Sequence, residues 1–436
     1  MRISTRNGMG ERFMVKSSMP AGAVLFAQSG TPTTVANAAL LAALTEAKRK
    51  AKVFHRLLGA RNGLLGILQE ELFDFAKEDP KALEALEICP ALAAGSCPYP
   101  LRTEADLARA VEVFQAHNIR YFFPIGNRDA MNAADRIGRL AEQKGHELVV
   151  MGIPATAENN LAFTDHCPGF GSAARYNATT IMEASRDTES LYTAEAVTVQ
   201  EIPGREAGWL TASCGLARRN EEDGPHLLLV PELPVNLNKF ADLVRDGLKR
   251  LGRCVVVVGE GAVDESGRFL SEQALEPGRD VAGPGPSEGA AEFLGHFIER
   301  EVGVKTRRNK PGSLLRSAMH WASRTDLDEA AKAGQMAVKH ALQGSTGFMV
   351  TLVRKSGRPY KCDTGLAKLS EAASGESRLP RHFMNEAGTH IADPFREYCL
   401  PLIKGDVTIP LGKDGLPLYP RLQRKLIPRK CGEWKR

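Results

Sequence analysis

Short apolar segments alternate with longer helical patterns along most of this chain. Residues 24–27 and 121–125 are continuous apolar runs, and helical patterns over residues 33–50 and 130–144 follow the turns that end them. Strands buried on both faces of a parallel sheet carry such runs, so the alternation predicts an α/β protein. Because ligands bind beyond the carboxyl ends of such strands, we expect the functional site in the loops that follow them.

The same patterns predict further elements and a division into domains. They are strands over 147–153, 227–230, 254–258 and 348–354, and helices over 237–251 and 326–343. A chain of 436 residues is long enough for two domains. We expect an N-terminal arm over 1–20, a first domain over 21–170 that part of 285–345 rejoins, a second domain over 171–284, and a surface extension over 346–436. The Pro- and Gly-rich segment 276–289 is expected to be a loop or hinge.

Composition narrows the class of protein. The net charge of +5 arises from interspersed charges of both signs, so no nucleic-acid partner is expected. No apolar run approaches the ~18 residues of a membrane helix. The eight cysteines form no C-x-x-C pair, which predicts reduced thiols in a cytoplasmic protein and no zinc site. The Arg- and Ser-rich start favours a disordered arm or a surface-packed extension over an organelle transit peptide. The basic run over 424–436 is expected to be solvated.

Four loops are candidates for the chemistry, and the first three begin where predicted strands end. The first, residues 28–33, could cradle a phosphate on backbone N–H groups at a helix N-terminus, or be a plain tight turn with a threonine N-cap. The others are residues 125–131, 152–160 and 164–176. The last one contains Pro-Gly-Phe-Gly-Ser-Ala-Ala-Arg-Tyr over 168–176, and it follows a Gly-Ile-Pro-x-Thr loop that begins at Gly152.

With these motifs the chain resembles the pyrophosphate-dependent 6-phosphofructokinases of the phosphofructokinase superfamily. Further matches occur in the family's order and spacing, and the resemblance runs from Val24 to about Ile427. They are Gly59-Ala60-Arg61-Asn62-Gly63, Gly95-Ser96-Cys97, Gly204-Arg205, Ala207-Gly208-Trp209, Pro231-Glu232 and Leu315-Arg316-Ser317.

The resemblance implies both a fold and an activity. The fold is two Rossmann-like parallel-sheet domains, a donor domain over 21–170 and a sugar-phosphate domain over 171–284, with the active site in the cleft between them. The activity is transfer of a phosphoryl group from pyrophosphate to the 1-hydroxyl of fructose 6-phosphate, a reversible step of glycolysis. It also implies Mg²⁺ and a homo-oligomer, a dimer or tetramer. Phosphoryl transfer depends mainly on positioning and charge stabilisation.

On the catalytic loop the chain departs from the family pattern Pro-Lys-Thr-Ile-Asp-Asn-Asp. By resemblance the catalytic base is Glu158, where the family has an aspartate. Ala155 replaces the lysine that helps to bind pyrophosphate, and Asn160 replaces the second aspartate. Glutamate keeps the carboxylate, but its extra methylene moves the oxygens by about 1 Å, and a misplacement of that size can lower a rate about a hundredfold.

The donor side contains the second departure. The resemblance assigns Gly30 and Gly126 to the phosphates, and Asp129 to the position at which pyrophosphate enzymes carry an aspartate that excludes ATP. Asp129 is also the candidate Mg²⁺ ligand. Arg128 stands at the position associated with magnesium; a guanidinium cannot bind a cation, but it can pair with a phosphate. Asn127 and Thr31 each replace a glycine, and their side chains are expected to crowd the donor.

On the sugar side the resemblance assigns Thr156, Gly204, Arg205, Glu232 and Arg316. The arginines would clamp the sugar phosphate and Glu232 would accept a hydrogen bond from a sugar hydroxyl. Either arginine could instead form an ordinary ion pair on the surface or between domains. His166 in the fourth loop could touch substrate or be a hydrogen-bonded loop histidine.

Two hypotheses of different class remain at this stage. In the first the chain is the phosphotransferase, with Glu158 as base. In the second it is a catalytically impaired paralogue that binds a sugar phosphate and regulates or stabilises an active partner subunit. A related kinase-fold enzyme with another donor or substrate is a third alternative.

Overall fold

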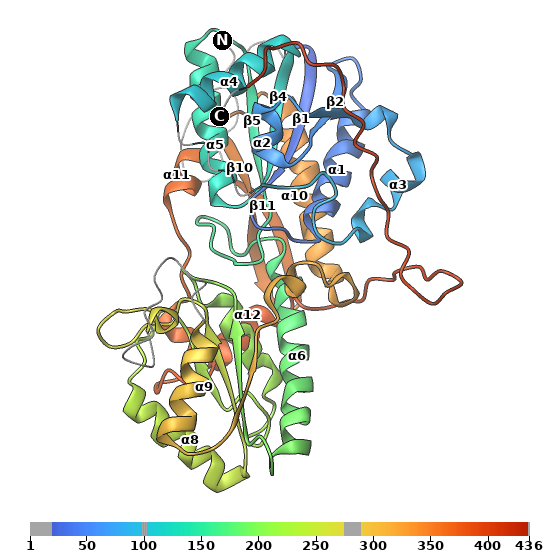
Figure 1. Ribbon diagram of the computed structural model, residues 1–436. Helices are drawn as coiled ribbons and strands as arrows, with labels where there is room; N and C mark the ends of the chain where they lie inside the picture. The colour runs from blue at the N-terminus through green and yellow to red at the C-terminus, as the bar shows by residue number, and fades with distance from the viewer. Residues whose placement is uncertain (1–19, 98, 100, 102, 274–288, 435–436) are drawn as a thin grey trace.

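Two sheets, one in each of two α/β domains, form the frame of the molecule (Figure 1). The computed structural model describes residues 20–97, 99, 101, 103–273 and 289–434. The first sheet has seven strands in the order β11-β10-β5-β4-β1-β2-β3. Their bounds are β1 Gly22–Ser29, β2 Phe54–Ala60, β3 Leu72–Asp74, β4 Ile119–Gly126, β5 Val149–Pro154, β10 Phe348–Gly357 and β11 Tyr360–Lys368. The two edge strands β3 and β11 pair antiparallel with their neighbours, and the other pairs are parallel.

Alternate side chains of β1 explain why this sheet is covered on both faces. Val24 and Phe26 point into one apolar core, while Leu25 and Ala27 point into another. Helices α1 (Ala36–Lys48) and α10 (Arg324–Leu342) supply the first core, and α4 (Glu104–Ala116) and α5 (Arg128–Gln143) supply the second. A strand with two buried faces needs the continuous apolar run that the sequence shows.

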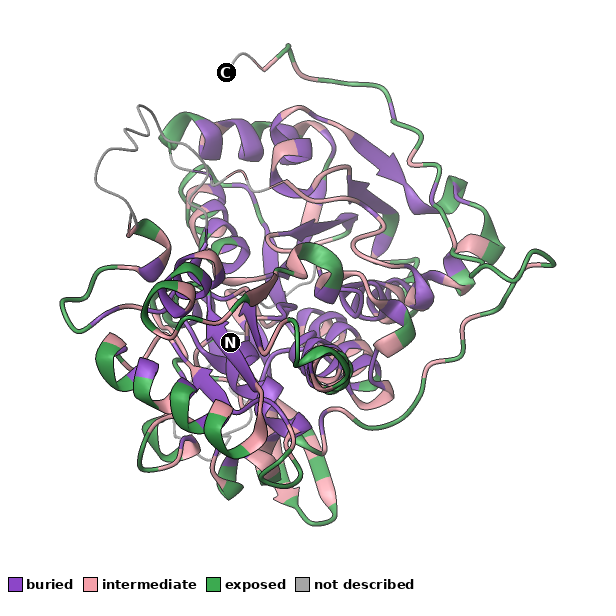
Figure 2. Cartoon of the chain, turned by 60° about the horizontal axis from the view of Figure 1, so that its bottom comes forward, coloured by how far each residue is buried: buried purple, intermediate pink, exposed green. Residues whose placement is uncertain are grey.

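The second sheet has four parallel strands in the order β7-β8-β6-β9. They are β6 Val197–Ile202, β7 Leu227–Leu229, β8 Cys254–Gly259 and β9 Thr306–Asn309. One face packs against α6 (Phe170–Leu191) and α7 (Trp209–Ser213), and the other against α8 (Leu237–Leu251) and α9 (Ala290–Glu301). In Figure 2 most strands are purple, hence buried, and the outer helices show a buried and an exposed side; the edge strand β9 is of intermediate burial.

The expected domain division differs from the observed sheets in two places. Helix α9 and strand β9 belong to the second sheet, so α10 is the element within 285–345 that rejoins the first domain. Strands β10 and β11 were expected in a surface extension, but they extend the first sheet: Phe348 and Met349 pair with β5. The reason is burial, because Met349 and Val350 are fully inaccessible to solvent.

The remaining short elements connect these layers. They are α2 Gly63–Leu68, α3 Pro80–Glu84, α11 Leu369–Ser374, α12 Asp393–Cys399, and the 3-10 helices Phe75–Lys77, Leu86–Ile88, Cys214–Ala217, Leu270–Glu272, Gly312–Arg316, Met319–Trp321 and Arg381–Phe383. Within the described part of the chain, no helix combines the length and apolar character needed to span a bilayer. The expected arm over 1–20, except Pro20, and nearly all of the expected hinge over 276–289 lie outside the described residues.

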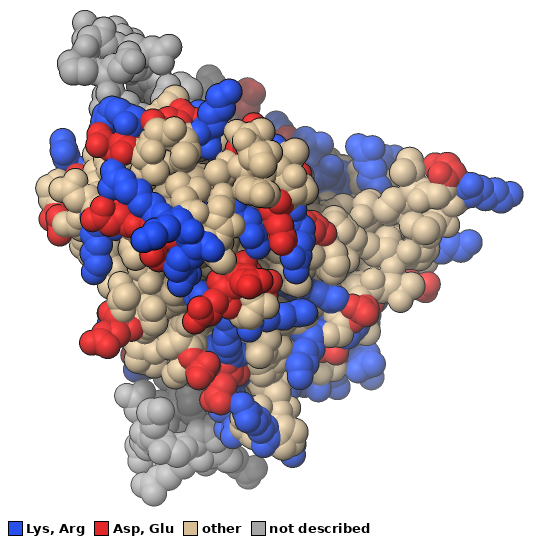
Figure 3. Space-filling view, turned by 90° about the horizontal axis from the view of Figure 1, so that it is seen from below, with Lys and Arg blue, Asp and Glu red and all other residues tan. Residues whose placement is uncertain are grey.

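After α12 the chain forms a hairpin over residues 411–417 that projects from the body (Figures 1 and 3). Figure 3 also shows lysine and arginine interspersed with acidic side chains over the face seen from below. The chain then returns to the first domain, where the Ile427 N–H donates to the Leu72 carbonyl and Glu70 and Glu78 accept N–H groups of residues 423, 424, 430 and 431. The basic segment from 424 onward was expected to be solvated, and Lys425, Arg429 and Lys430 are indeed exposed, while its backbone is held by these two buried carboxylates.

Candidate active site

The loops after β1 and β4 touch because both contain glycine. A Cβ added to Gly126 would lie 2.0 Å from the carbonyl oxygen of Ser29, and one added to Gly30 would lie 2.4 Å from Asn127 Oδ1. Gly30 also has φ +89°, which residues with side chains rarely adopt. Asn127 caps α5 by accepting the Ala130 N–H at 3.4 Å. The two glycines assigned to the phosphates therefore lie side by side at the start of a helix.

Arg128 and Asp129 occupy the first turn of α5. The Arg128 guanidinium donates to Glu206 at 3.0 Å and lies 3.8 Å from Glu376. Glu206 belongs to the loop after β6, so this ion pair joins the donor side to the second domain. Asp129 is exposed, and its negative charge contributes to raising the pKa of Glu206.

Glu158 lies four residues after the end of β5, and its neighbours orient it. Its backbone N–H donates to the Thr156 hydroxyl at 3.2 Å, and the Asn160 side-chain amide donates to its carboxylate at 3.1 Å. The Thr31 side chain also forms a hydrogen bond with this carboxylate. Two residues that depart from the family pattern, Thr31 and Asn160, are thus partners of the candidate base.

The environment of Glu158 raises the pKa of its carboxyl, which suits a proton acceptor. Burial raises the pKa of its carboxyl above the usual range, and the negative charges of Glu206 and Glu260 raise it further, while Arg316 and the Thr31 hydrogen bond oppose the shift. A general base works best when its pKa lies near the working pH. The raised pKa of Glu158 therefore moves the carboxyl toward the range that proton abstraction requires.

Glu206 and Glu376 form a pair of carboxyl groups beside Arg128. A hydrogen bond with Glu376 is the largest cause that raises the pKa of Glu206, followed by burial, while Arg128 lowers it. Oxygen ligands of this kind suit Mg²⁺, so the chemistry of the region fits a hard cation near Asp129. Among the described residues, one group combines a histidine, a cysteine and a carboxylate whose possible ligand atoms lie within 4.8 Å of one another. Its members are His166, Glu329 and Cys362. Nitrogen and sulfur ligands do not suit Mg²⁺.

Three of the sugar-side residues lie in the second domain with partners of their own. Gly204 has φ +130°, and its N–H donates to Glu260 at 3.4 Å. Arg205 is exposed; it pairs with Glu272 at 3.0 Å and stacks 4.4 Å above the ring of Phe269.

Glu232 and Arg316 complete the sugar side. One Glu232 oxygen accepts the N–H groups of Gly208 and Leu379, at 2.9 and 2.8 Å. The other oxygen is buried and has no hydrogen-bond partner in the structure. Arg316 ends the 3-10 helix over Gly312–Arg316, and its charge acts on Glu158.

Hydrogen bonds, ion pairs and close contacts connect most of the predicted site residues into one region. Gly30, Gly126, Arg128, Thr156, Glu158 and Arg316 are linked directly or through Thr31, Asn127 and Glu206. Arg205 and Glu232 are instead engaged within the second domain and with residue 379, so the interactions of Arg205 match the ion-pair alternative in this structure.

The fourth loop is shorter than expected. Residues 170–176 form the first turns of α6, because the carboxylate of Asp326 accepts the N–H groups of Gly169 and Ser172 at 2.8 and 2.7 Å. His166 is 1% exposed and bonded to Asp165 and Glu329. It is therefore a hydrogen-bonded loop histidine rather than a substrate contact.

Two residues of the region were not predicted. Glu206 lies between Arg205 and Ala207, inside a motif that matched the family, yet only the ion pair with Arg128 reveals its place. Glu376 follows α11 in the expected extension, where no sequence signal marks it.

Two α/β domains whose strand-end loops meet at one site are typical of phosphotransferases of the phosphofructokinase family. The chain belongs to that family, whose profile matches residues 23–341. It is similar to the pyrophosphate–fructose 6-phosphate 1-phosphotransferases of Xanthomonas campestris and Halomonas elongata. The identities are 39% and 37%, over 95% and 94% of this chain and 100% and 98% of those proteins. A solved structure, a pyrophosphate-dependent phosphofructokinase from Marinobacter aquaeolei, is 36% identical with a TM-score of 0.86, over 95% of this chain and 100% of that one.

Proposed function

We propose that this protein transfers a phosphoryl group from pyrophosphate to the 1-hydroxyl of fructose 6-phosphate. The products are fructose 1,6-bisphosphate and phosphate. The observation that carries the proposal is the environment of Glu158, a carboxyl of raised pKa in the region where donor-side and sugar-side loops meet. Proteins that are similar to this chain over almost its whole length are named for this reaction.

In the proposed mechanism Glu158 accepts the proton of the sugar 1-hydroxyl as the oxygen attacks the terminal phosphorus. The bond between that phosphorus and the bridging oxygen breaks, and phosphate leaves. Thr31 and Asn160 hold the Glu158 carboxylate through hydrogen bonds, so its oxygens keep one orientation during the transfer. Positioning of this kind is the main contribution that a protein makes to phosphoryl transfer.

The donor side binds pyrophosphate through backbone and charge. Gly30 and Gly126 bring unhindered backbone to the N-terminus of α5, where N–H groups favour phosphate. Arg128 is the cationic group at that helix start, and it would exchange Glu206 for a phosphate oxygen when the donor binds. Asp129 would disfavour ATP.

Mg²⁺ is the expected cofactor, and Asp129 is the residue of this chain that would hold it. When bound, the ion supplies positive charge that offsets the charge of the moving phosphoryl group. Oxygen ligands near Asp129 suit it, and the like charges that raise the pKa of Glu206 would be relieved by a cation.

The sugar side would bind fructose 6-phosphate through Thr156, Gly204, Arg205, Glu232 and Arg316. Glu232 carries the clearest signal, because its second oxygen is buried without a partner and is free to accept a sugar hydroxyl. Arg205 would exchange Glu272 for the sugar phosphate, which an exposed ion pair permits at little free-energy cost.

The alternative of an impaired regulatory paralogue is not favoured, since the relatives named as phosphotransferases match along almost the full chain. A cytoplasmic location agrees with eight free cysteines. The family also implies a dimer or tetramer, and exposed Leu411, Leu416 and Leu418 offer an apolar surface for such a contact. Light scattering on the purified protein measures that state.

The test is production of fructose 1,6-bisphosphate from fructose 6-phosphate and Mg²⁺, with pyrophosphate in one arm and ATP in the other. We expect turnover with pyrophosphate only. Glu158→Gln should lower kcat by about 10²–10⁴, the usual contribution of a general base, while Glu142→Gln on the exposed side of α5 is the matched control. A Glu158→Gln variant as active as its parent would refute the assignment.

A further inference from the structure

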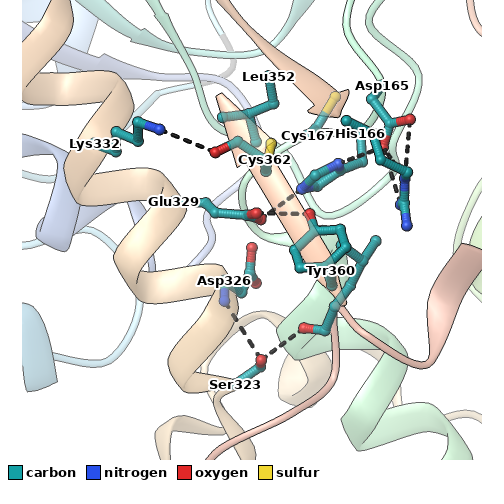
Figure 4. A network of polar contacts seen from close by, with 12 residues as sticks. Asp165, His166, Cys167, Ser323, Asp326, Glu329, Lys332, Leu352, Tyr360 and Cys362 are labelled. Atoms are coloured by element: carbon teal, nitrogen blue, oxygen red, sulfur yellow. Dashed lines mark hydrogen bonds and ion pairs between the residues drawn. The ribbon is translucent and has the colours of Figure 1, made fainter. Parts of the chain in front are cut away.

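A buried histidine outside the reacting groups joins three parts of the first domain (Figure 4). His166 lies between the loop that carries Glu158, helix α10 and the β10–β11 hairpin. Its Nδ1 is 2.8 Å from Asp165 and its Nε2 is 2.6 Å from Glu329. Carboxylates only accept hydrogen bonds, so both ring nitrogens donate and the side chain is an imidazolium.

The surrounding charges support this protonation state. Burial opposes the charged form, but the bonds to Asp165 and Glu329 outweigh it and raise the pKa of His166 to about 9. Arg354 pairs with Asp165 at 3.0 Å, and the Tyr360 hydroxyl donates to Glu329 at 2.6 Å. Burial raises the pKa of the adjacent Cys362 to about 12, so it remains a neutral thiol. Asp326, one turn before Glu329 on α10, has its pKa raised to about 6 by burial. Two cations therefore balance the two carboxylates that contact His166.

This cluster is connected to Glu158 by short steps. Asn159 accepts the Cys167 N–H at 2.7 Å and donates to the Tyr398 hydroxyl at 2.9 Å. That hydroxyl donates to the Asp165 carbonyl at 2.9 Å. The residue after Glu158 is thus bonded to the residue after His166 and, through Tyr398, to the residue before it.

The same loop is closed at its other end. The Thr156 N–H donates to the Pro168 carbonyl at 2.9 Å, and Thr156 pairs with Gly169 in an isolated bridge. Asn159 itself has φ +57°, a conformation that needs such support in a residue other than glycine. The backbone that carries Glu158 therefore has little freedom while the His166 bonds persist.

We infer that His166 is a positioning residue of the phosphotransferase, and that its bonds to Asp165 and Glu329 hold the loop of Glu158 on helix α10. The inference rests on the proposed function for its catalytic readout. Without the imidazolium, the buried carboxylate of Glu329 and the partly buried carboxylate of Asp165 have no cation between them, and the loop moves. A displacement of about 1 Å at the reacting carboxylate can lower a rate about a hundredfold.

The experiment compares His166→Gln with His226→Gln. His226 is also buried, but it lies at the edge of the second sheet and bonds to backbone groups of Glu222 and Val255. We expect kcat of His166→Gln to fall about tenfold to a hundredfold per folded molecule, with the KM values of both substrates within about threefold of the parent. His226→Gln should lose stability and keep kcat. Tyr360→Phe, which removes one hydroxyl, covers the case in which His166→Gln does not fold, and it should lower kcat in the same direction.

A pH profile separates positioning from a purely structural role. In the parent, kcat should fall as the pH rises through about 9, because the imidazolium then loses one of the two ring protons that it donates to Asp165 and Glu329. His166→Gln should lack this alkaline limb. The inference is overturned if His166→Gln and Tyr360→Phe lose thermal stability but keep the parent's kcat and alkaline limb. An inactive parent would instead refute the proposed function, and the NMR signals of ¹⁵N-labelled histidine would still show whether the ring of His166 carries two protons at neutral pH.

Discussion

The Arg128 guanidinium donates to the Glu206 carboxylate at 3.0 Å, and this ion pair joins the first turn of α5 to the loop after β6. The two residues belong to different domains and lie 78 positions apart in sequence. Arg128 also follows Gly126, one of the two glycines assigned to the phosphates, by two positions in the sequence. Arg128 therefore belongs both to the proposed pyrophosphate site and, through its ion pairs with Glu206 and Glu376, to the interface between the two domains.

We predict that Arg128→Leu raises the KM for pyrophosphate about tenfold, since it removes a charge-assisted hydrogen bond. The KM for fructose 6-phosphate should change much less, because the sugar-side residues remain. Steady-state kinetics with each substrate varied at saturation of the other measures both values.

The control is Arg139→Leu on the same helix. Arg139 forms an ion pair with Asp135 at 2.9 Å and is 63% exposed, so its removal should leave both KM values unchanged. An equal effect of the two substitutions on pyrophosphate would contradict a specific role for Arg128.

Glu206→Gln is expected to move the acid limb of kcat to lower pH. Burial and then the negative charge of Glu206 raise the pKa of Glu158. A base must be ionised to accept a proton, so activity falls as the pH drops through this raised pKa. Removal of the Glu206 charge lowers the pKa, and activity then persists to lower pH. A pH–rate profile of parent and variant measures the limb, and an unmoved or raised limb would contradict the electrostatic argument.

The His226 side chain should make the free energy of unfolding depend on pH in the acid range. Burial, helped by Arg253, Arg218 and Arg250, lowers its pKa from 6.5 to about 4. The unfolded chain therefore binds more protons between these values, and the free energy of unfolding falls as the pH drops from 6.5 to 4.

The contribution of this one group is at most about 1.4 kcal/mol per pH unit. In His226→Gln that contribution disappears, so the stability of the variant should fall less steeply over the same window. Urea unfolding at several pH values gives both slopes; parallel slopes would show that His226 does not titrate in this way.

Gly126→Ala should destabilise the protein by about 1–3 kcal/mol, the usual range for an overpacked site. The added methyl group would lie 2.0 Å from the Ser29 carbonyl oxygen of the neighbouring strand. Gly357→Ala at the end of β10 is the control, because its added methyl group would meet no atom within 4 Å. Chemical denaturation of both variants compares the free energies of unfolding, and equal values would contradict the close approach of β1 and β4.

The strands that sequence reasoning found are those with continuous apolar runs. Residues 24–27 and 121–125 lie inside β1 and β4, and the helix over 237–251 matches α8. β2 was not predicted, because His55 and Arg56 interrupt its apolar pattern with exposed side chains. Local periodicity detects an element only when both its faces, or one regular face, are buried.

Contacts between distant residues explain what the sequence could not predict. The start of α6 depends on Asp326, more than 150 positions away from Gly169 and Ser172, so the motif by itself predicts a loop. The family motifs pointed to Glu158 and Arg128, but not to Glu206 and Glu376, whose roles depend on the packing of the two domains.

The return of residues 423–431 to the first domain affects the order in which the protein matures on the ribosome. The buried carboxylates of Glu70 and Glu78 receive their backbone partners from this segment. During translation both acidic groups therefore emerge hundreds of residues before the amides that donate hydrogen bonds to them. The first domain, although its opening strand is made early, cannot reach its final state until this late segment has left the exit tunnel.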